Sequence, residues 1–134
     1  MRQIGVGIIG TGWCGGIRAE TCAAHPLVKV IDIAETKPER LAEMAKLANV
    51  RLAVADYKQL IDQKDLDAII ISATPETTHY PMARDALKAG KHVFLEKPPG
   101  ATLSEVADLE ALAASKGLSP VSYTHLTLPT ILRV

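Results

Sequence analysis

The segment from Ile4 to Gly16, IGVGIIGTGWCGG, decides the fold that this sequence predicts. Its first part, Ile4–Ile9, is a short apolar run, which is typical of a buried strand. Gly10, Gly12 and Gly15 follow in the G-x-G-x-x-G spacing, and a helix is expected after them. A strand, a glycine turn and a helix in this order form a loop whose free amide groups can hold a phosphate.

Each glycine of this spacing has its own expected task. Gly10 allows a tight turn, Gly12 lets the backbone approach a pyrophosphate, and Gly15 lets the helix lie close to the strand. A glycine turn without a ligand would show the same spacing, so the strand before it and the helix after it carry the prediction. The side chain of Trp13 is expected either to cover the loop or to contact the cofactor. The candidate cofactor-binding residues of the loop are Gly10, Thr11, Gly12, Trp13, Cys14 and Gly15.

An acidic residue follows the expected second strand, Val28–Ala34, at a distance that suits a ribose contact. Glu35 lies twenty positions after Gly15, where a carboxylate can accept both ribose hydroxyls and repel a 2'-phosphate. This position favours NAD, although the cation of Lys37 would tolerate NADP. Asp32 is a rival acid, but it lies inside the strand and is expected to be hydrogen-bonded in place.

The rest of the chain alternates between apolar runs typical of strands and the periodicity typical of helices. Further strands are expected at residues 52–54, 68–72 and 92–95. Thr36 with Glu39 has the spacing of a capping box, and Thr102 with Glu105 has the same spacing before the last helix. Leu103 is expected on the buried face of that helix. We therefore predict an α/β fold with a doubly wound parallel sheet, in one dinucleotide-binding domain of residues 1–118.

Composition excludes several classes of function. Among 134 residues, 15 Lys and Arg balance 15 Asp and Glu without a basic cluster, so no nucleic-acid partner is expected. No apolar run has the length of a membrane span, and the N-terminus lacks the pattern of a cleaved signal, so no membrane association is expected. Cys14 and Cys22 suit neither a disulfide nor a metal site. These features predict a cytoplasmic protein without a bound metal.

The stretch HVFLEKPPG, His92–Gly100, places an acid and a base where Pro98 ends a strand. In isolation, Glu96 and Lys97 would be interpreted as a surface ion pair of little energetic weight. Together with GTGWCGG, AETKPERL, DAIIISATPETTH and ALKAGKHVFLEKP, they make residues 3–118 resemble the N-terminal half of the Gfo/Idh/MocA oxidoreductases. The resemblance implies NAD(P)-dependent transfer of a hydride between nicotinamide and a hydroxyl-bearing carbon of a sugar, cyclitol or related polyol.

The resemblance also implies roles for particular residues. Glu96 would bond the nicotinamide-side ribose, and Lys97 would be the catalytic group that reaches the reacting hydroxyl or carbonyl. Ala73, Thr74 and Pro75 match the family turn that passes the cofactor. His79 is interpreted as a cofactor-proximal contact, with helix capping as the alternative.

Two departures from the family pattern concern the C-terminal part of the sequence. Family members continue into a second domain that carries most substrate contacts and usually a proton-transferring histidine, and that usually mediates assembly into homo-oligomers. The segment VSYTHLTLPT, Val121–Thr130, instead resembles the translated reading frame of a sequencing adapter, although a genuine strand remains the alternative. We therefore expect residues 119–134 to be a non-native or unstructured tail.

These departures limit what the chain is expected to do alone. As written, it is expected to bind a dinucleotide weakly and to catalyse no reaction, because the proton-transfer partner and the substrate-binding wall are missing. The alternative function, from another class, is a non-catalytic NAD(P)-binding module that regulates or senses redox state. Cofactor binding without hydride transfer to any polyol would distinguish that module from the enzyme.

Overall fold

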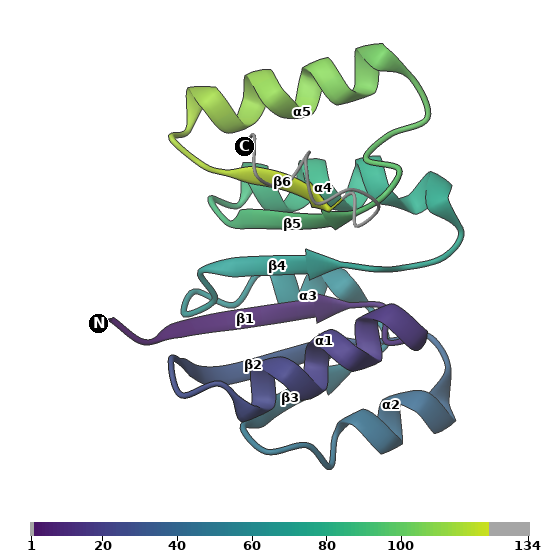
Figure 1. Cartoon of the computed structure of the whole chain (residues 1–134), viewed down its shortest axis with the longest axis vertical. Coiled ribbons are helices and arrows are strands. Elements are labelled where there is room, and N and C mark those ends of the chain that lie inside the picture. The colour runs from purple at the N-terminus through teal and green to yellow at the C-terminus, as the bar shows by residue number, and fades with distance from the viewer. Residues whose placement is uncertain (1, 124–134) are drawn as a thin grey trace, which may run out of the picture.

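The computed structural model describes residues 2–123 as alternating strands and helices (Figure 1). The N-terminal elements are β1 (Ile4–Ile9), α1 (Trp13–Ala24), β2 (Val28–Ala34), α2 (Pro38–Met44), β3 (Val50–Val54) and α3 (Tyr57–Ile61). The C-terminal elements are β4 (Ala68–Ile71), the 3-10 helix η1 (Glu76–Thr78), α4 (His79–Lys88), β5 (His92–Glu96), α5 (Leu103–Ser115) and β6 (Pro120–Tyr123). In this part of the chain no helix is long and apolar enough to cross a membrane.

The strands form one parallel sheet in the order β3-β2-β1-β4-β5-β6. The chain winds outward from β1 to β3, returns to the centre at β4, and winds outward again to β6 (Figure 1). The strand order therefore reverses between β1 and β4, which is where open α/β sheets bind ligands at the carboxyl ends of their strands. The predicted doubly wound fold is confirmed.

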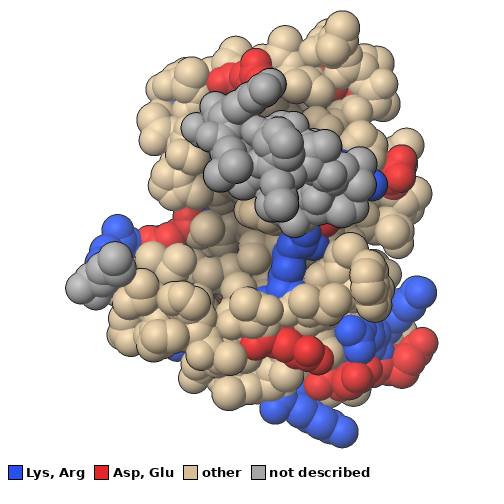
Figure 2. Space-filling view, viewed as in Figure 1, with Lys and Arg blue, Asp and Glu red and all other residues tan. Residues whose placement is uncertain are grey.

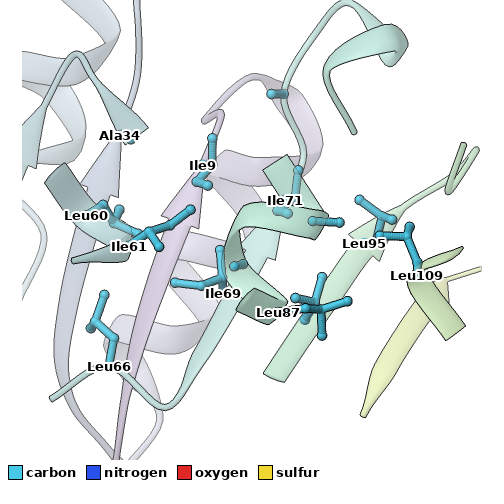
Figure 3. Close-up of a cluster of buried hydrophobic side chains, with 14 of the residues drawn as sticks. Ile9, Ala34, Leu60, Ile61, Leu66, Ile69, Ile71, Leu87, Leu95 and Leu109 are labelled. Carbon is cyan, nitrogen blue, oxygen red and sulfur yellow. The ribbon is translucent and has the colours of Figure 1, made fainter. Parts of the chain in front are cut away.

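The sheet has a hydrophobic cluster on each face. One contains Ile69 and Ile71 of β4 together with side chains of α3, α4 and α5 (Figure 3). The other joins β1 and β2 to Ala19 of α1 and Met44 of α2, and Ile70 packs against it. Successive residues of β4 thus point to opposite faces, and both faces are covered by helices. This explains why the sequence of β4 is continuously apolar.

The helices α2 and α5 confirm one sequence prediction and correct two others. Thr102 caps α5 by accepting a hydrogen bond from the Glu105 amide, at 3.2 Å. The expected capping box of Thr36 is wrong, because α2 has Lys37 as its N-cap residue without a side-chain cap, and begins at Pro38. The expected burial of Leu103 is wrong, because this residue is 89% exposed. Successive residues of a helix are about 100° apart around its axis, so Leu103 lies roughly 120° from the buried Leu109 on α5.

The sheet extends past residue 118, the boundary that the sequence suggested. β6 pairs with β5 in parallel, from Val93 opposite Pro120 to Glu96 opposite Tyr123. The described residues at the start of the expected tail, Pro120–Tyr123, thus form a strand. Residues 124–134 lie outside the described part, and a non-native origin of the tail stays a prediction.

A buried lysine closes the turn that leads into β4. Lys91 is 6% exposed, and its Nζ donates hydrogen bonds to the carbonyl oxygens of Gln63 and Leu66, at 2.7 and 2.8 Å. Burial lowers the pKa of Lys91, against the opposing effect of Asp67 and Asp65. Lys91 therefore holds the segment between α3 and β4 against the start of β5.

Lys91→Met is expected to lower the free energy of unfolding by about 1–3 kcal/mol, because two backbone carbonyls lose their hydrogen-bond donor. Urea denaturation followed by circular dichroism would measure the change. The matched control is Lys46→Met, which replaces an exposed lysine and should leave the midpoint almost unchanged. Equal midpoints for both variants would contradict the structural role of Lys91.

Candidate functional site

The glycine loop joins β1 to α1 beside the carboxyl end of β4. Gly10 has a φ of 84°, and a Cβ there would lie 2.6 Å from Cα of Ala73. A Cβ on Gly15 would lie 1.9 Å from the carbonyl oxygen of Gly10. Gly12 differs from both, because a Cβ there would meet nothing within 4 Å. The loop's own packing thus requires two of the glycines, whereas the third faces open space that a ligand can enter.

Two cavities meet at Gly12. The first, here called the Glu35 cavity, has a volume of about 460 Å³, and α2 and the end of β2 supply much of its wall. Acidic and basic side chains gather over the α2 end of the molecule (Figure 2). The second, the Lys97 cavity, has a volume of about 860 Å³ and lies beside the ends of β4 and β5. Both cavities are lined by Gly12, Ser72, Ala73 and Thr74.

Glu35 is buried and tied to the glycine loop. Its Oε2 accepts hydrogen bonds from the amide and the hydroxyl of Thr11, at 2.7 and 2.8 Å, and its Oε1 accepts one from the Lys37 amide at 3.1 Å. Burial would raise the pKa of Glu35, but these hydrogen bonds outweigh it and hold the pKa below its ordinary value. The Thr11 amide is thus committed to Glu35. Because Thr11 is fully buried, this amide does not face the cavity.

Arg40 of α2 is a residue of the Glu35 cavity that the sequence did not single out. Its Nε donates to the carbonyl oxygen of Thr11 at 2.5 Å, and its Nη1 pairs with Glu43 at 2.7 Å. Lys37 lines the same cavity. The acid at the end of β2 therefore shares its cavity with two cations. One signal was available, since Arg40 lies close to one helical turn after Lys37.

The Lys97 cavity brings together most of the residues that the sequence proposed for the nicotinamide side. Trp13, with 83% of its surface exposed, lines this cavity together with the side chain of Lys97. The other proposed residues in its wall are Gly12, Cys14, Ala73, Thr74, His79 and Glu96. Three candidates, Thr11, Gly15 and Pro75, line neither cavity. The glycine loop and Lys97 thus face one cleft.

Glu96 pairs with Arg18 of α1 and not with Lys97, so the interpretation as a Glu96–Lys97 ion pair is wrong. Arg18 Nη1 lies 2.7 Å from Glu96 Oε2. The sequence analysis missed Arg18, because a single arginine inside a helix after a glycine loop carries no recognisable pattern. The structure shows that this residue belongs to the wall of the Lys97 cavity.

His79 holds two turns of the site together. Its ring is 2% exposed, with Nδ1 at 2.8 Å from the carbonyl oxygen of Pro98 and Nε2 at 2.9 Å from that of Ala73. Both ring nitrogens are therefore directed at backbone, and neither is free for a polar contact with a cofactor. The alternative of helix capping does not hold, because both partners lie outside α4. His79 does line the Lys97 cavity, and its proximity to a cofactor stays a prediction.

Asp32 behaves as the sequence predicted. It is fully buried and held by Arg51, whose Nε lies 3.1 Å from Oδ1. It contributes to neither cavity. Within residues 2–123, no three side chains of His, Cys, Asp or Glu are arranged to hold a metal ion, and both cysteines are free. The charged side chains in the walls of the two cavities include Glu35, Glu96 and Lys97.

Known proteins are similar to this chain in sequence and in fold. A family model described as an oxidoreductase family with an NAD-binding Rossmann fold matches residues 4–125. Levoglucosan dehydrogenase from Pseudarthrobacter phenanthrenivorans is 34% identical over 98% of this chain and 36% of its own length. Scyllo-inositol dehydrogenase from Lactobacillus casei, solved with bound NAD(H) and scyllo-inositol, has a TM-score of 0.82 and 28% identity, over 90% of this chain and 36% of that one.

A third similar structure is biliverdin reductase from Synechocystis sp. PCC 6803, in complex with biliverdin and NADP+. Its TM-score is 0.81 at 31% identity, over 89% of this chain and 37% of that one. The chain thus spans little more than a third of the proteins it matches. The family match contains the glycine loop, Glu35 and the Glu96–Lys97 pair of neighbours. The chain belongs to the Gfo/Idh/MocA oxidoreductase family, which has an NAD-binding Rossmann fold.

Proposed function

We propose that the chain binds a nicotinamide dinucleotide across both cavities, with the diphosphate over Gly12. The observation that carries this proposal is the meeting of the two cavities at the one loop glycine whose Cβ position is open. The adenosine would occupy the Glu35 cavity and the nicotinamide the Lys97 cavity. Amides at the start of α1, from Gly12 to Cys14, would face the diphosphate at the positive end of the helix.

The adenosine side favours NAD. An ionised Glu35 would repel the 2'-phosphate of NADP, and hydrogen bonds hold its pKa low enough for the charge to persist at neutral pH. Lys37 and Arg40 line the same cavity and would attract that phosphate, so NADP remains the second cofactor of the proposal. Both cofactors occur in structures similar to this chain.

The reaction that the Lys97 cavity supports best is hydride transfer to or from a hydroxyl-bearing carbon of a sugar, cyclitol or related polyol. Two similar proteins, levoglucosan dehydrogenase and scyllo-inositol dehydrogenase, carry such substrates in their names. The bound nicotinamide would supply or accept the hydride. The Lys97 ammonium would stabilise the negative charge that develops on the substrate oxygen, and Glu96 would orient the adjacent ribose.

The rival function is a non-catalytic NAD(P)-binding module that regulates or senses redox state. Such a module needs the glycine loop and Glu35, but it has no need of a lysine in the second cavity. The presence of Lys97 in the cavity wall therefore favours the enzyme. We further propose that the protein acts in the cytoplasm. We also propose that a protein of the length of its relatives, of which this chain would be about one third, forms a homo-oligomer.

Gly12→Ala tests whether the open space at the loop is a ligand site. The affinity for NADH is expected to fall about tenfold or more, since the added methyl occupies the space assigned to the diphosphate. Quenching of Trp13, the single tryptophan of the chain, would report binding. The thermal midpoint should not change, whereas Gly15→Ala should lower it, because its Cβ would clash with Gly10. Unchanged NADH affinity in Gly12→Ala would refute the placement.

Parallel titrations with NADH and NADPH test the role of Glu35. The native chain is expected to bind NADH more tightly, and Glu35→Gln should reduce or reverse this preference because Lys37 and Arg40 remain. The ratio of the two affinities is the quantity to compare, since loosening of the Thr11 contact weakens both cofactors alike. Tighter binding of NADPH by the native chain would overturn the assignment.

Lys97→Ala in the full-length enzyme is expected to lower kcat by about 10²- to 10³-fold, the usual cost of removing one group that stabilises charge on the substrate oxygen in the transition state. The dissociation constant for NADH should change by less than about threefold, because the lysine addresses the substrate. Steady-state kinetics with a polyol and calorimetric titration with NADH would measure both quantities. Near-normal turnover would eliminate Lys97 as the catalytic group.

A further inference from the structure

Arg18 connects three elements at the carboxyl edge of the sheet. From α1, its guanidinium lies 2.7 Å from Oε2 of Glu96 at the end of β5. Its Nη1 also donates to Ser72 Oγ at 3.2 Å, just after β4, and its guanidinium carbon lies 5.2 Å from the ring centroid of Phe94. The planar guanidinium, with several donors, can make these contacts at once, as a lysine ammonium cannot. Arg18 is therefore fixed by both strands that border the Lys97 cavity.

This contact determines how Glu96 is presented. The carboxylate side chain is 16% exposed, and its Oε2 is buried against Arg18 without an aligned hydrogen bond. Because Oε2 is turned to the guanidinium, Oε1 is the oxygen left for a ligand in the cavity that Glu96 lines. A carboxylate held at one oxygen in this way offers the other in a fixed direction, which suits the orientation of a hydroxyl group.

The same contact leaves Lys97 without an acidic partner. Lys97 follows Glu96 directly, and both residues line the same cavity. Among the ion pairs of residues 2–123, Glu96 is paired with Arg18 and none includes Lys97. The exposed ammonium of Lys97 therefore remains available in the cavity.

We propose that Arg18 is a positioning residue of the cofactor and substrate site, which captures Glu96 so that this acid faces the nicotinamide-side ribose and Lys97 stays free. The inference rests on the proposed function and adds a residue to it. Arg18 itself need not touch the reacting atoms. Its effect reaches the cofactor through Glu96 and reaches the substrate through the availability of Lys97.

Calorimetric titrations of the chain with NADH and with ADP test the proposal, since ADP carries the adenosine and the diphosphate but no nicotinamide riboside. Arg18→Met is expected to weaken NADH about tenfold, as Glu96→Gln should, and to leave the affinity for ADP unchanged. The double variant should lose no more than the larger single loss, because both changes remove the same contact. Arg18→Lys should retain part of the NADH affinity.

The matched control is Arg84→Met, which removes an arginine paired with Asp108 at 3.1 Å, in a position that lines neither cavity. It should alter neither affinity. Equal weakening of NADH and ADP by Arg18→Met, additive losses in the double variant, or unchanged NADH affinity would each overturn the inference. Failure of the native chain to bind NADH would instead refute the proposed function. If Arg18→Met unfolds, Arg18→Lys and Glu96→Gln supply the same comparison.

The availability of Lys97 has a second readout that requires no cofactor. Acylation of lysines by an activated ester, followed by mass spectrometry, gives the rate at Lys97. Arg18→Met should slow this rate about two- to fivefold, because Glu96 can then turn to Lys97 and form an ion pair with it. This fold-change corresponds to the usual free energy of an exposed ion pair. Adding Glu96→Gln to Arg18→Met should restore the rate. An unchanged rate in Arg18→Met would contradict the capture of Glu96 by Arg18.

Discussion

The close approach of α1 to the glycine loop is the constraint on which the site depends. A Cβ at Gly15 would lie 1.9 Å from the carbonyl oxygen of Gly10, and a Cβ at Gly10 would lie 2.6 Å from Ala73. The absence of a side chain at both positions lets the start of α1 and the glycine loop lie against the ends of β1 and β4. Only because the helix lies this close can Arg18, in its second turn, reach Ser72 and the end of β5. The loop that we propose for the diphosphate therefore also helps to build the second cavity.

A second set of contacts fixes the turns that follow the strands. Glu35 binds the amide and hydroxyl of Thr11, which ties the end of β2 to the loop after β1. The His79 ring lies between carbonyl groups of Ala73 and Pro98, which ties the end of β4 to the end of β5. The carboxyl edge of the sheet is thus held by side-chain bonds to backbone. Such preorganisation reduces the ordering that a ligand would have to impose.

The sequence predicted the strands well and the side-chain contacts poorly. Hydrophobic patterns are local, so β1 and β2 begin and end at the predicted residues, Ile4–Ile9 and Val28–Ala34. The glycine spacing is also local, and it located the loop. The pairing of Arg18 with Glu96 joins residues far apart in the chain, and it depends on how closely α1 lies on the sheet. No periodicity or spacing encodes that distance, so the ion pair became visible only in the folded chain.

The arginines and the lysines that line the two cavities differ in their contacts. The two arginines, Arg40 and Arg18, are engaged with Glu43 and Glu96, where a planar group with several donors can join separate elements. The two lysines, Lys37 and Lys97, take part in none of the ion pairs of residues 2–123, and they line different cavities on either side of the glycine loop.

A compact ammonium on a flexible stem can move to meet a ligand, whereas a fixed guanidinium cannot do so without breaking its contacts. The arginines therefore give the site its shape. In the proposed complex, Lys37 would face the adenosine side of the dinucleotide and Lys97 would face the substrate.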